Sequence, residues 1–242
     1  MPYGTGTIIG MPMRNERGFT LVELLCAIGA GIILLAAIYT AVTFGYRSSI
    51  AVERKVTALQ DARAALELMS TEIRMASYNP NFAMNMWVDP AVCNGVSANQ
   101  GYRGVQVADA NNVLVQMDIS ESSIIGDNPS EIIQYTYDAA NERITRSTNC
   151  GAAQPFLGDT AASGNPRTVR VINATLGIPV FRYFNGTGTE IPAANLPASI
   201  PDIRRIDITL AVETEHVDPN TNQRRRLIYS TGVIPRNHAP AL

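Results

Sequence analysis

The sequence has little of what catalytic sites are usually built from. Its 242 residues include two histidines, His216 and His238, and three cysteines. It contains no CxxC pair, HExxH motif, phosphate-binding loop or nucleophile elbow. We expect both histidines to be exposed to solvent, His216 near a predicted hairpin tip and His238 in the C-terminal tail. These absences argue against an enzyme, and no cofactor is predicted.

A strong charge imbalance is also missing. The formal net charge is -2 at pH 7, so the overall charge gives no indication of nucleic-acid binding. One short basic run, Arg224, Arg225 and Arg226, lies in a predicted strand, where Arg224 and Arg226 would share one face. We expect solvated side chains there, and contact with DNA or an acidic partner is the alternative.

A metal site is not predicted either. Asp218, Asn220 and Asn222 have the alternating oxygen ligands with which a calcium loop begins, but the central glycine and the terminal glutamate of that loop are missing. We therefore expect residues 218–222 to form a hairpin turn.

One long apolar run is present near the N-terminus. No residue from Leu24 to Phe44 carries a formal charge, and about 20 such residues allow a helix to cross a bilayer. Glu23 directly precedes this run, and a carboxylate so close to lipid needs a partner or a proton. The small residue Gly18 lies before the run, whereas an ordinary secretory signal is cut after its apolar core. Cleavage at Gly18 would leave the apolar helix on the mature protein.

The junction Arg17-Gly18-Phe19-Thr20-Leu21-Val22-Glu23-Leu24-Leu25 resembles the class III signal of type IV prepilins and type II secretion pseudopilins. In that family a membrane aspartyl peptidase cuts after a glycine, which maps to Gly18. It also methylates the new N-terminal residue, which maps to Phe19. The resemblance implies that Glu23 pairs with the N-terminal amine of a neighbouring subunit. A generic single-pass anchor is the alternative, and a start at Met13 would give a short basic leader.

The resemblance also implies a location and a set of partners. Residues 1–18 would be a leader that is removed, and residues 19–45 a transmembrane and assembly helix. The chain would cross the inner membrane once, with a cytoplasmic N-terminus and a periplasmic domain, before it joins a pilus at the cell surface. Positive charges flank the apolar run on both sides, so this orientation depends on the resemblance. The implied partners are other major and minor pilins, the prepilin peptidase and the inner-membrane assembly platform.

An amphipathic pattern follows the apolar run. Apolar residues recur at spacings of three, four or seven: Val52, Val56, Leu59, Leu66, Met69, Ile73 and Ala76. A charged face is predicted opposite them, with Asp61, Arg63, Glu67, Glu72 and Arg74. Asn79-Pro80 is a stop signal. We predict one helix over residues 19–78, whose amphipathic half, residues 46–78, packs on a sheet; an isolated coiled-coil stalk is the alternative.

Residues 79–242 are predicted to form a β-rich periplasmic domain. Runs of alternating β-branched and aromatic residues predict strands over residues 113–119, 132–137, 142–147, 168–172, 179–184, 203–212 and 225–233. Turn residues at 138–141 and 218–222 predict hairpins. The predicted fold class is α+β and pilin-like: one long helix packed on an antiparallel β-sheet with long loops.

Two stretches, residues 79–104 and 149–167, are predicted to be surface loops. Loops of this length are uncommon unless they bind a ligand or are tied down. Cys93 lies in one and Cys150 in the other, while Cys26 lies in the membrane helix. Because an exported domain enters an oxidising compartment, we predict a Cys93–Cys150 disulfide, with two free thiols as the alternative.

These features predict a minor pilin that primes or caps a type IV pilus by helix–helix packing with other subunits. Residues 64–78 also resemble the corresponding stretch of PilW-type minor pilins, and large irregular loops suit a specialised subunit better than a repeating shaft. A J-like type II secretion pseudopilin is the alternative within this class. A DNA-uptake or adhesion module and a membrane-tethered enzyme are the alternatives from other classes.

Overall fold

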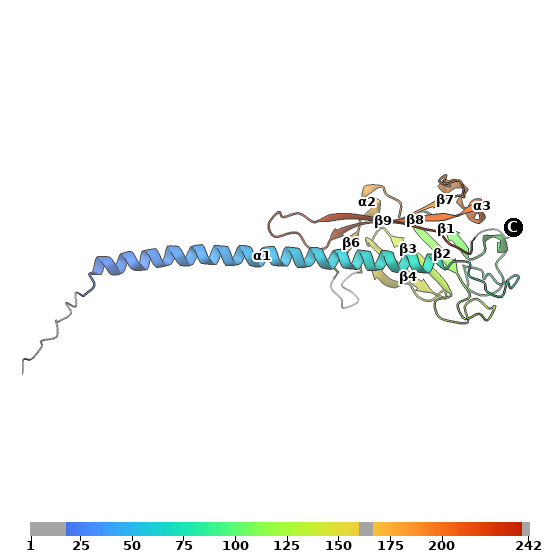
Figure 1. Cartoon of the computed structure of the whole chain (residues 1–242), viewed down its shortest axis with the longest axis horizontal. Helices are drawn as coiled ribbons and strands as arrows, with labels where there is room; N and C mark the ends of the chain where they lie inside the picture. The colour runs from blue at the N-terminus through green and yellow to red at the C-terminus, as the bar shows by residue number, and fades with distance from the viewer. Residues whose placement is uncertain (1–17, 160–166, 239–242) are drawn as a thin grey trace, which may run out of the picture. The chain divides into compact units, whose positions relative to one another are not determined.

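The structure is a computed structural model that describes residues 18–159 and 167–238. The chain divides into two compact units, Met1–Arg47 and Ser48–Leu242, and helix α1 (Leu21–Arg74) contributes to both (Figure 1). Within the described residues, all buried hydrophobic side chains lie in the second unit. That unit therefore contains its own core. The leader up to Arg17, and with it Met13, lies outside the described residues.

Helix α1 confirms the predicted long helix but is shorter at both ends. It begins after Thr20 and ends at Arg74. Beyond that point the backbone tightens, because Met75 and Ala76 donate their N–H groups to carbonyls three residues earlier, each at 3.1 Å. Ser77 then takes a left-handed conformation, with a φ of 66°, which stops the helix before the predicted stop at Asn79-Pro80.

Two antiparallel sheets follow the helix in the chain, where a single sheet was predicted. The first sheet has the order β1-β2-β3-β4-β5, with β1 (Val105–Ala108), β2 (Asn112–Gln116), β3 (Ile132–Asp138), β4 (Arg143–Thr148) and β5 (Gln154–Leu157). In the second, β6 (Val169–Val171), β7 (Phe181–Phe184) and β9 (Arg226–Val233) pair with β8 (Arg205–Thr214). Short helical segments connect the strands: η1 (Gln100–Tyr102), α2 (Asn173–Leu176), η3 (Ala193–Asn195), α3 (Leu196–Ser199) and η4 (Ile200–Asp202).

The predicted α+β, pilin-like fold class is confirmed, but the strands form two sheets and not one, and the central strand of the second is β8. It pairs with β6 through Val212–Thr214 and with β7 through Arg205–Ile208 on one side, and with β9 along the other. Among the described residues, no strand of the first sheet pairs with a strand of the second. Both predicted hairpins are confirmed, since β3 pairs with β4 and β8 with β9. Strand β5 lies inside the predicted loop 149–167 and is an edge strand that contains a proline, Pro155.

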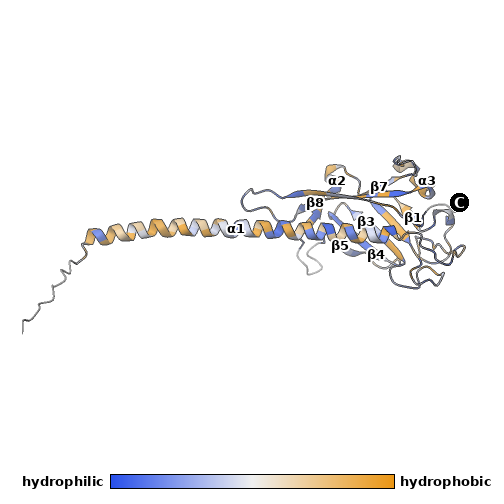
Figure 2. Ribbon diagram, viewed as in Figure 1, coloured by the Kyte–Doolittle hydropathy of each residue, from blue (hydrophilic) through white to orange (hydrophobic). Residues whose placement is uncertain are grey.

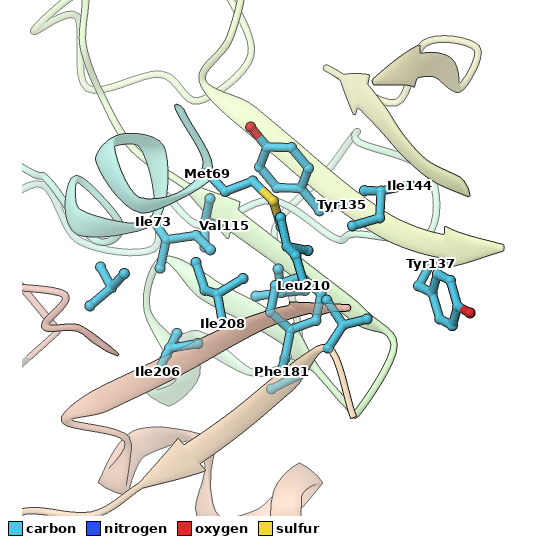
Figure 3. Close-up of a cluster of buried hydrophobic side chains, with 14 of the residues drawn as sticks. Met69, Ile73, Val115, Tyr135, Tyr137, Ile144, Phe181, Ile206, Ile208 and Leu210 are labelled. Carbon is cyan, nitrogen blue, oxygen red and sulfur yellow. The ribbon is translucent and has the colours of Figure 1, made fainter. Parts of the chain in front are cut away.

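One main core is shared by α1 and both sheets. Figure 3 shows Met69 and Ile73 of α1 among side chains from both sheets, including Val115, Tyr135 and Ile208. The predicted stripe on α1 is wrong at its start, because Val52 and Val56 are exposed. The buried positions on α1 are Ala58, Ala62, Ala65, Met69, Glu72 and Ile73. The predicted Met69 and Ile73 are therefore confirmed, whereas the three alanines were missed by a pattern of mainly large apolar residues.

Glu72 is a correction to the predicted charged face of α1. Its side chain lies in the protein interior, where Oε1 accepts a hydrogen bond at 2.6 Å from Nη2 of Arg146 on β4. Oε2 accepts further bonds from Nε of Arg146 at 3.1 Å and from the hydroxyl of Tyr135 on β3. Burial, followed by the bond to Glu72, raises the pKa of the Tyr135 phenol. The carboxylate therefore fixes the helix to two neighbouring strands of the first sheet.

The long loop over residues 79–104 is tied down, and the predicted disulfide is present. Cys93 and Cys150 are bonded, with 5.7 Å between their Cα atoms. The buried side chain of Gln116 accepts a bond from the N–H of Val88 at 2.9 Å and donates one to its carbonyl at 2.8 Å. A second, smaller core lies below this loop, formed by Met86, Trp87, Leu114, Ile125 and Ile132. The disulfide, the Gln116 bonds and the second core therefore hold the loop over residues 79–104 in one conformation.

Candidate processing and assembly site

The Gly18–Phe19 bond lies in non-helical chain directly before α1. Apart from its neighbours in the chain, no described residue lies within 4 Å of the position that a Cβ atom on Gly18 would occupy, and Phe19 is 89% exposed. A peptidase must reach the backbone of the bond that it cuts, and helical hydrogen bonding would hinder this. The bond after Gly18 meets both conditions, because it is open to solvent and outside the helix.

Thr20 and Glu23 form a capping box at the first turn of α1. The Glu23 backbone N–H donates to the Thr20 hydroxyl at 3.2 Å, and Glu23 Oε2 accepts bonds from the N–H and the hydroxyl of Thr20, each at 2.9 Å. This reciprocal pattern satisfies donors that a helix start otherwise leaves without a partner. Thr20 was not among the predicted site residues, although the spacing Thr-x-x-Glu before an apolar run is the signature of a capping box.

The N-terminal part of α1 is apolar on all sides. In the first unit its large apolar side chains are exposed, from Leu21 to Tyr46, and Figure 2 shows the hydrophobic colouring of this segment. The hydroxyls of Thr40 and Thr43 donate to carbonyls of the preceding turn, at 2.8 Å and 2.9 Å, so these polar groups are satisfied without water. By length and composition, α1 could cross a membrane.

His238 is a correction, because it was predicted in an exposed tail and is buried. Its Nε2 lies 2.8 Å from the carbonyl oxygen of Ile200, and its Nδ1 lies 2.9 Å from the hydroxyl oxygen of Ser77. Since a carbonyl can only accept, Nε2 carries the proton and Nδ1 accepts from Ser77. Burial lowers the pKa of His238 to about 4. The imidazole therefore stays neutral near pH 7 and holds the C-terminal segment against the end of α1.

The basic run lies at the β8–β9 hairpin, and each arginine has a partner. Arg224 Nε donates to the carbonyl of Glu215 at 3.0 Å, Arg225 pairs with Asp218 at 3.2 Å, and Arg226 pairs with Glu213 at 2.9 Å. Two of the three arginines therefore have a carboxylate partner within their own hairpin, and Arg224 has a carbonyl.

The residues considered for calcium lie in the same turn and are used locally. The Asp218 carboxylate accepts the N–H of Asn220 at 2.8 Å, and this bond, with a smaller contribution from Arg225, holds the pKa of Asp218 below its usual range. His216 is exposed at the hairpin, as predicted. Over residues 18–159 and 167–238, no group of three or more His, Cys, Asp or Glu residues could hold a metal ion.

Comparison with known protein families gives a match for the N-terminal part of the chain. Residues 13–39 match the family described as the prokaryotic N-terminal methylation motif. The match includes Gly18, Phe19, Thr20 and Glu23, and it confirms the resemblance to the class III signal of type IV pilins. It supports a structural rather than an enzymatic protein and, with the apolar helix, is consistent with a membrane-anchored pilin. No curated protein and no solved structure gives a match.

Proposed function

We propose that this chain is a minor pilin of the PilW type that primes or caps a type IV pilus. The observation that carries the proposal is the exposed Gly18–Phe19 bond directly before a capped apolar helix that has Glu23 in its first turn. The methylation motif over residues 13–39 supports assignment to the type IV pilins and pseudopilins. The function is then assembly by helix–helix packing, with no catalytic turnover.

The proposed sequence of events begins in the inner membrane. The chain crosses it once, with its N-terminus in the cytoplasm and the second unit in the periplasm. The prepilin peptidase cuts after Gly18 and methylates Phe19, and the assembly platform then transfers the subunit into a filament of major and minor pilins. There the carboxylate of Glu23 pairs with the N-terminal amine of a neighbouring subunit, because each charge would otherwise lie uncompensated in an apolar environment.

The pairing role is tested with Glu23→Val, and with Glu67→Val as the matched control. Both residues are glutamates on α1, but Glu67 is exposed in the second unit. We expect Glu23→Val to insert and to be cleaved normally, as shown by the intact mass of the mature chain, yet to enter pili poorly. Glu67→Val should behave like the wild type in both measurements. A normal number of pili with Glu23→Val would rule out the pairing role.

The class of filament is tested by deletion of the gene. A priming or capping subunit predicts loss of pili and copurification with other minor pilins. If deletion instead abolishes type II secretion and leaves pili intact, the chain is a pseudopilin. The ion pairs of Arg225 and Arg226 within the hairpin give no support to a DNA-binding role.

A further inference from the structure

An exposed aromatic side chain is presented by the loop that follows α1. Phe82 is 86% exposed, and Met84, two residues further on, is 90% exposed. Phe82 also has a left-handed backbone conformation, with a φ of 53°, and so does Asn85, with a φ of 56°. This conformation is unfavourable for a bulky side chain, and burial of the ring in this chain does not compensate for it.

Hydrogen bonds from neighbouring side chains hold the turn in this conformation. The Asn79 side chain accepts the N–H of Ala83 at 2.9 Å and donates to its carbonyl at 3.0 Å. Asn81 Nδ2 donates to the carbonyl of Glu121 at 2.7 Å. Just beyond the turn, the Gln100 side chain bonds to both backbone groups of Trp87, at 2.7 Å and 3.3 Å. The loop thus presents Phe82 and Met84 in a fixed position.

Phe82 and Met84 border a depression of about 820 Å³. Its wall includes Tyr78 and Trp87, and two arginines, Arg103 and Arg236, also line it. No aspartate or glutamate is among the described residues that line it. Arg236 is exposed and has no ion pair with any residue in the ranges 18–159 and 167–238. The surface therefore combines apolar and aromatic groups with positive charge, a composition that is typical of the centre of a protein interface.

We propose that this surface, defined by Phe82, Met84 and Arg236, docks an acidic face of a different folded protein. The ring of Phe82 would enter an apolar pocket of that partner, and a partner carboxylate would pair with Arg236. Charge complementarity disfavours a second copy of this chain, because a twofold arrangement would bring Arg236 next to its own counterpart. The inference does not depend on the N-terminal signal or on the type of filament.

The test is photo-crosslinking of the full chain in its native cells. Benzoylphenylalanine is placed at position 84, and at position 228 as a control, since Ile228 is an exposed apolar residue on β9. We expect position 84 to crosslink one protein other than this chain, through a segment that contains aspartate or glutamate, and position 228 not to crosslink it. Phe82→Gly and Arg236→Glu should each reduce that product at least about tenfold.

Thermal unfolding of the purified variants separates docking from a structural role. Because glycine tolerates the backbone conformation at position 82, Phe82→Gly should leave the melting temperature unchanged or higher. Restoration of the crosslink to Arg236→Glu by a charge reversal in the partner's segment would support the proposal directly. Crosslinks only to copies of this chain, only to lipid or to nothing would overturn it. So would a lower melting temperature with Phe82→Gly, or an unchanged yield with Arg236→Glu.

Discussion

Replacement of Glu72 by methionine removes the central acceptor of a buried cluster that joins α1 to the first sheet. The carboxylate accepts two bonds from Arg146 and one from the hydroxyl of Tyr135. Methionine has a similar size and favours helices, so the change leaves the packing and the helix propensity nearly unaltered. What is lost is the partner of a guanidinium and of a phenol.

The size of the effect follows from the burial of the two charges. The Glu72 side chain is 12% exposed and the Arg146 side chain 22% exposed, so neither charge is well solvated. Removal of one member of a buried pair typically costs about 3–5 kcal/mol, and the partial exposure of Arg146 favours a value of about 3 kcal/mol. Replacement of both residues by methionine should cost much less than the sum of the two single changes, since no charge is then left without a partner.

The assay is urea unfolding of the unit Ser48–Leu242, which contains its own core. Circular dichroism monitors the unfolding. Glu67→Met is the control on the exposed side of the same helix, and it should change stability by less than about 0.5 kcal/mol. Two results would refute the reasoning. One is a loss below about 1 kcal/mol for Glu72→Met, and the other is additivity of the Glu72 and Arg146 changes to within about 0.5 kcal/mol.

Three further predictions follow from local contacts. Thr20→Val should speed amide hydrogen exchange in the first turn of α1 by removing a cap worth about 1 kcal/mol, whereas Thr20→Ser should not; equal exchange would contradict the capping box. The pKa of His238 is about 4 in the folded chain and about 6.5 when unfolded. Between these two values unfolding takes up a proton, so the free energy of unfolding should fall by roughly 3 kcal/mol as the pH drops from about 6.5 to 4. The variant His238→Gln should lack this pH-dependent loss. Reduction of Cys93–Cys150, whose members are 57 residues apart, should cost up to about 4 kcal/mol; two thiols that alkylate in the unit Ser48–Leu242 before reduction would exclude the bond.

Features that depend on neighbours in the chain could be predicted from the sequence. The helix, both hairpins and the motif at Gly18 each arise from a short pattern that is read locally. Thr20 belongs to the same class, because its role follows from its spacing to Glu23. The disulfide was also predictable, although its members are distant, because Cys26 lies in the apolar run and only two cysteines remained.

Features that depend on residues distant in the chain could not be predicted. Glu72 looks like any charged residue on a helix, and its burial is decided by Arg146, which is 74 residues away. His238 is buried and hydrogen-bonded to Ser77, 161 residues away, and to Ile200, 38 residues away. The pairing of β8 with both β6 and β7 likewise joins residues that lie far apart in the chain. In each case the two contacting residues lie far apart in the chain, and no local sequence pattern links them.

Two of the five carboxylates of α1, Glu23 and Glu72, differ in the contacts that they leave open to another subunit. Both oxygens of Glu72 accept bonds within the chain and the residue is buried, so it is not accessible to another subunit. Glu23 accepts bonds from Thr20 through Oε2, while its Oε1 accepts none from residues 18–159 or 167–238. In a bilayer that free oxygen would be costly without a donor. An amine from a neighbouring subunit can therefore bind Oε1 while the cap at Oε2 stays intact, and the proposed pairing requires no rearrangement of the helix start.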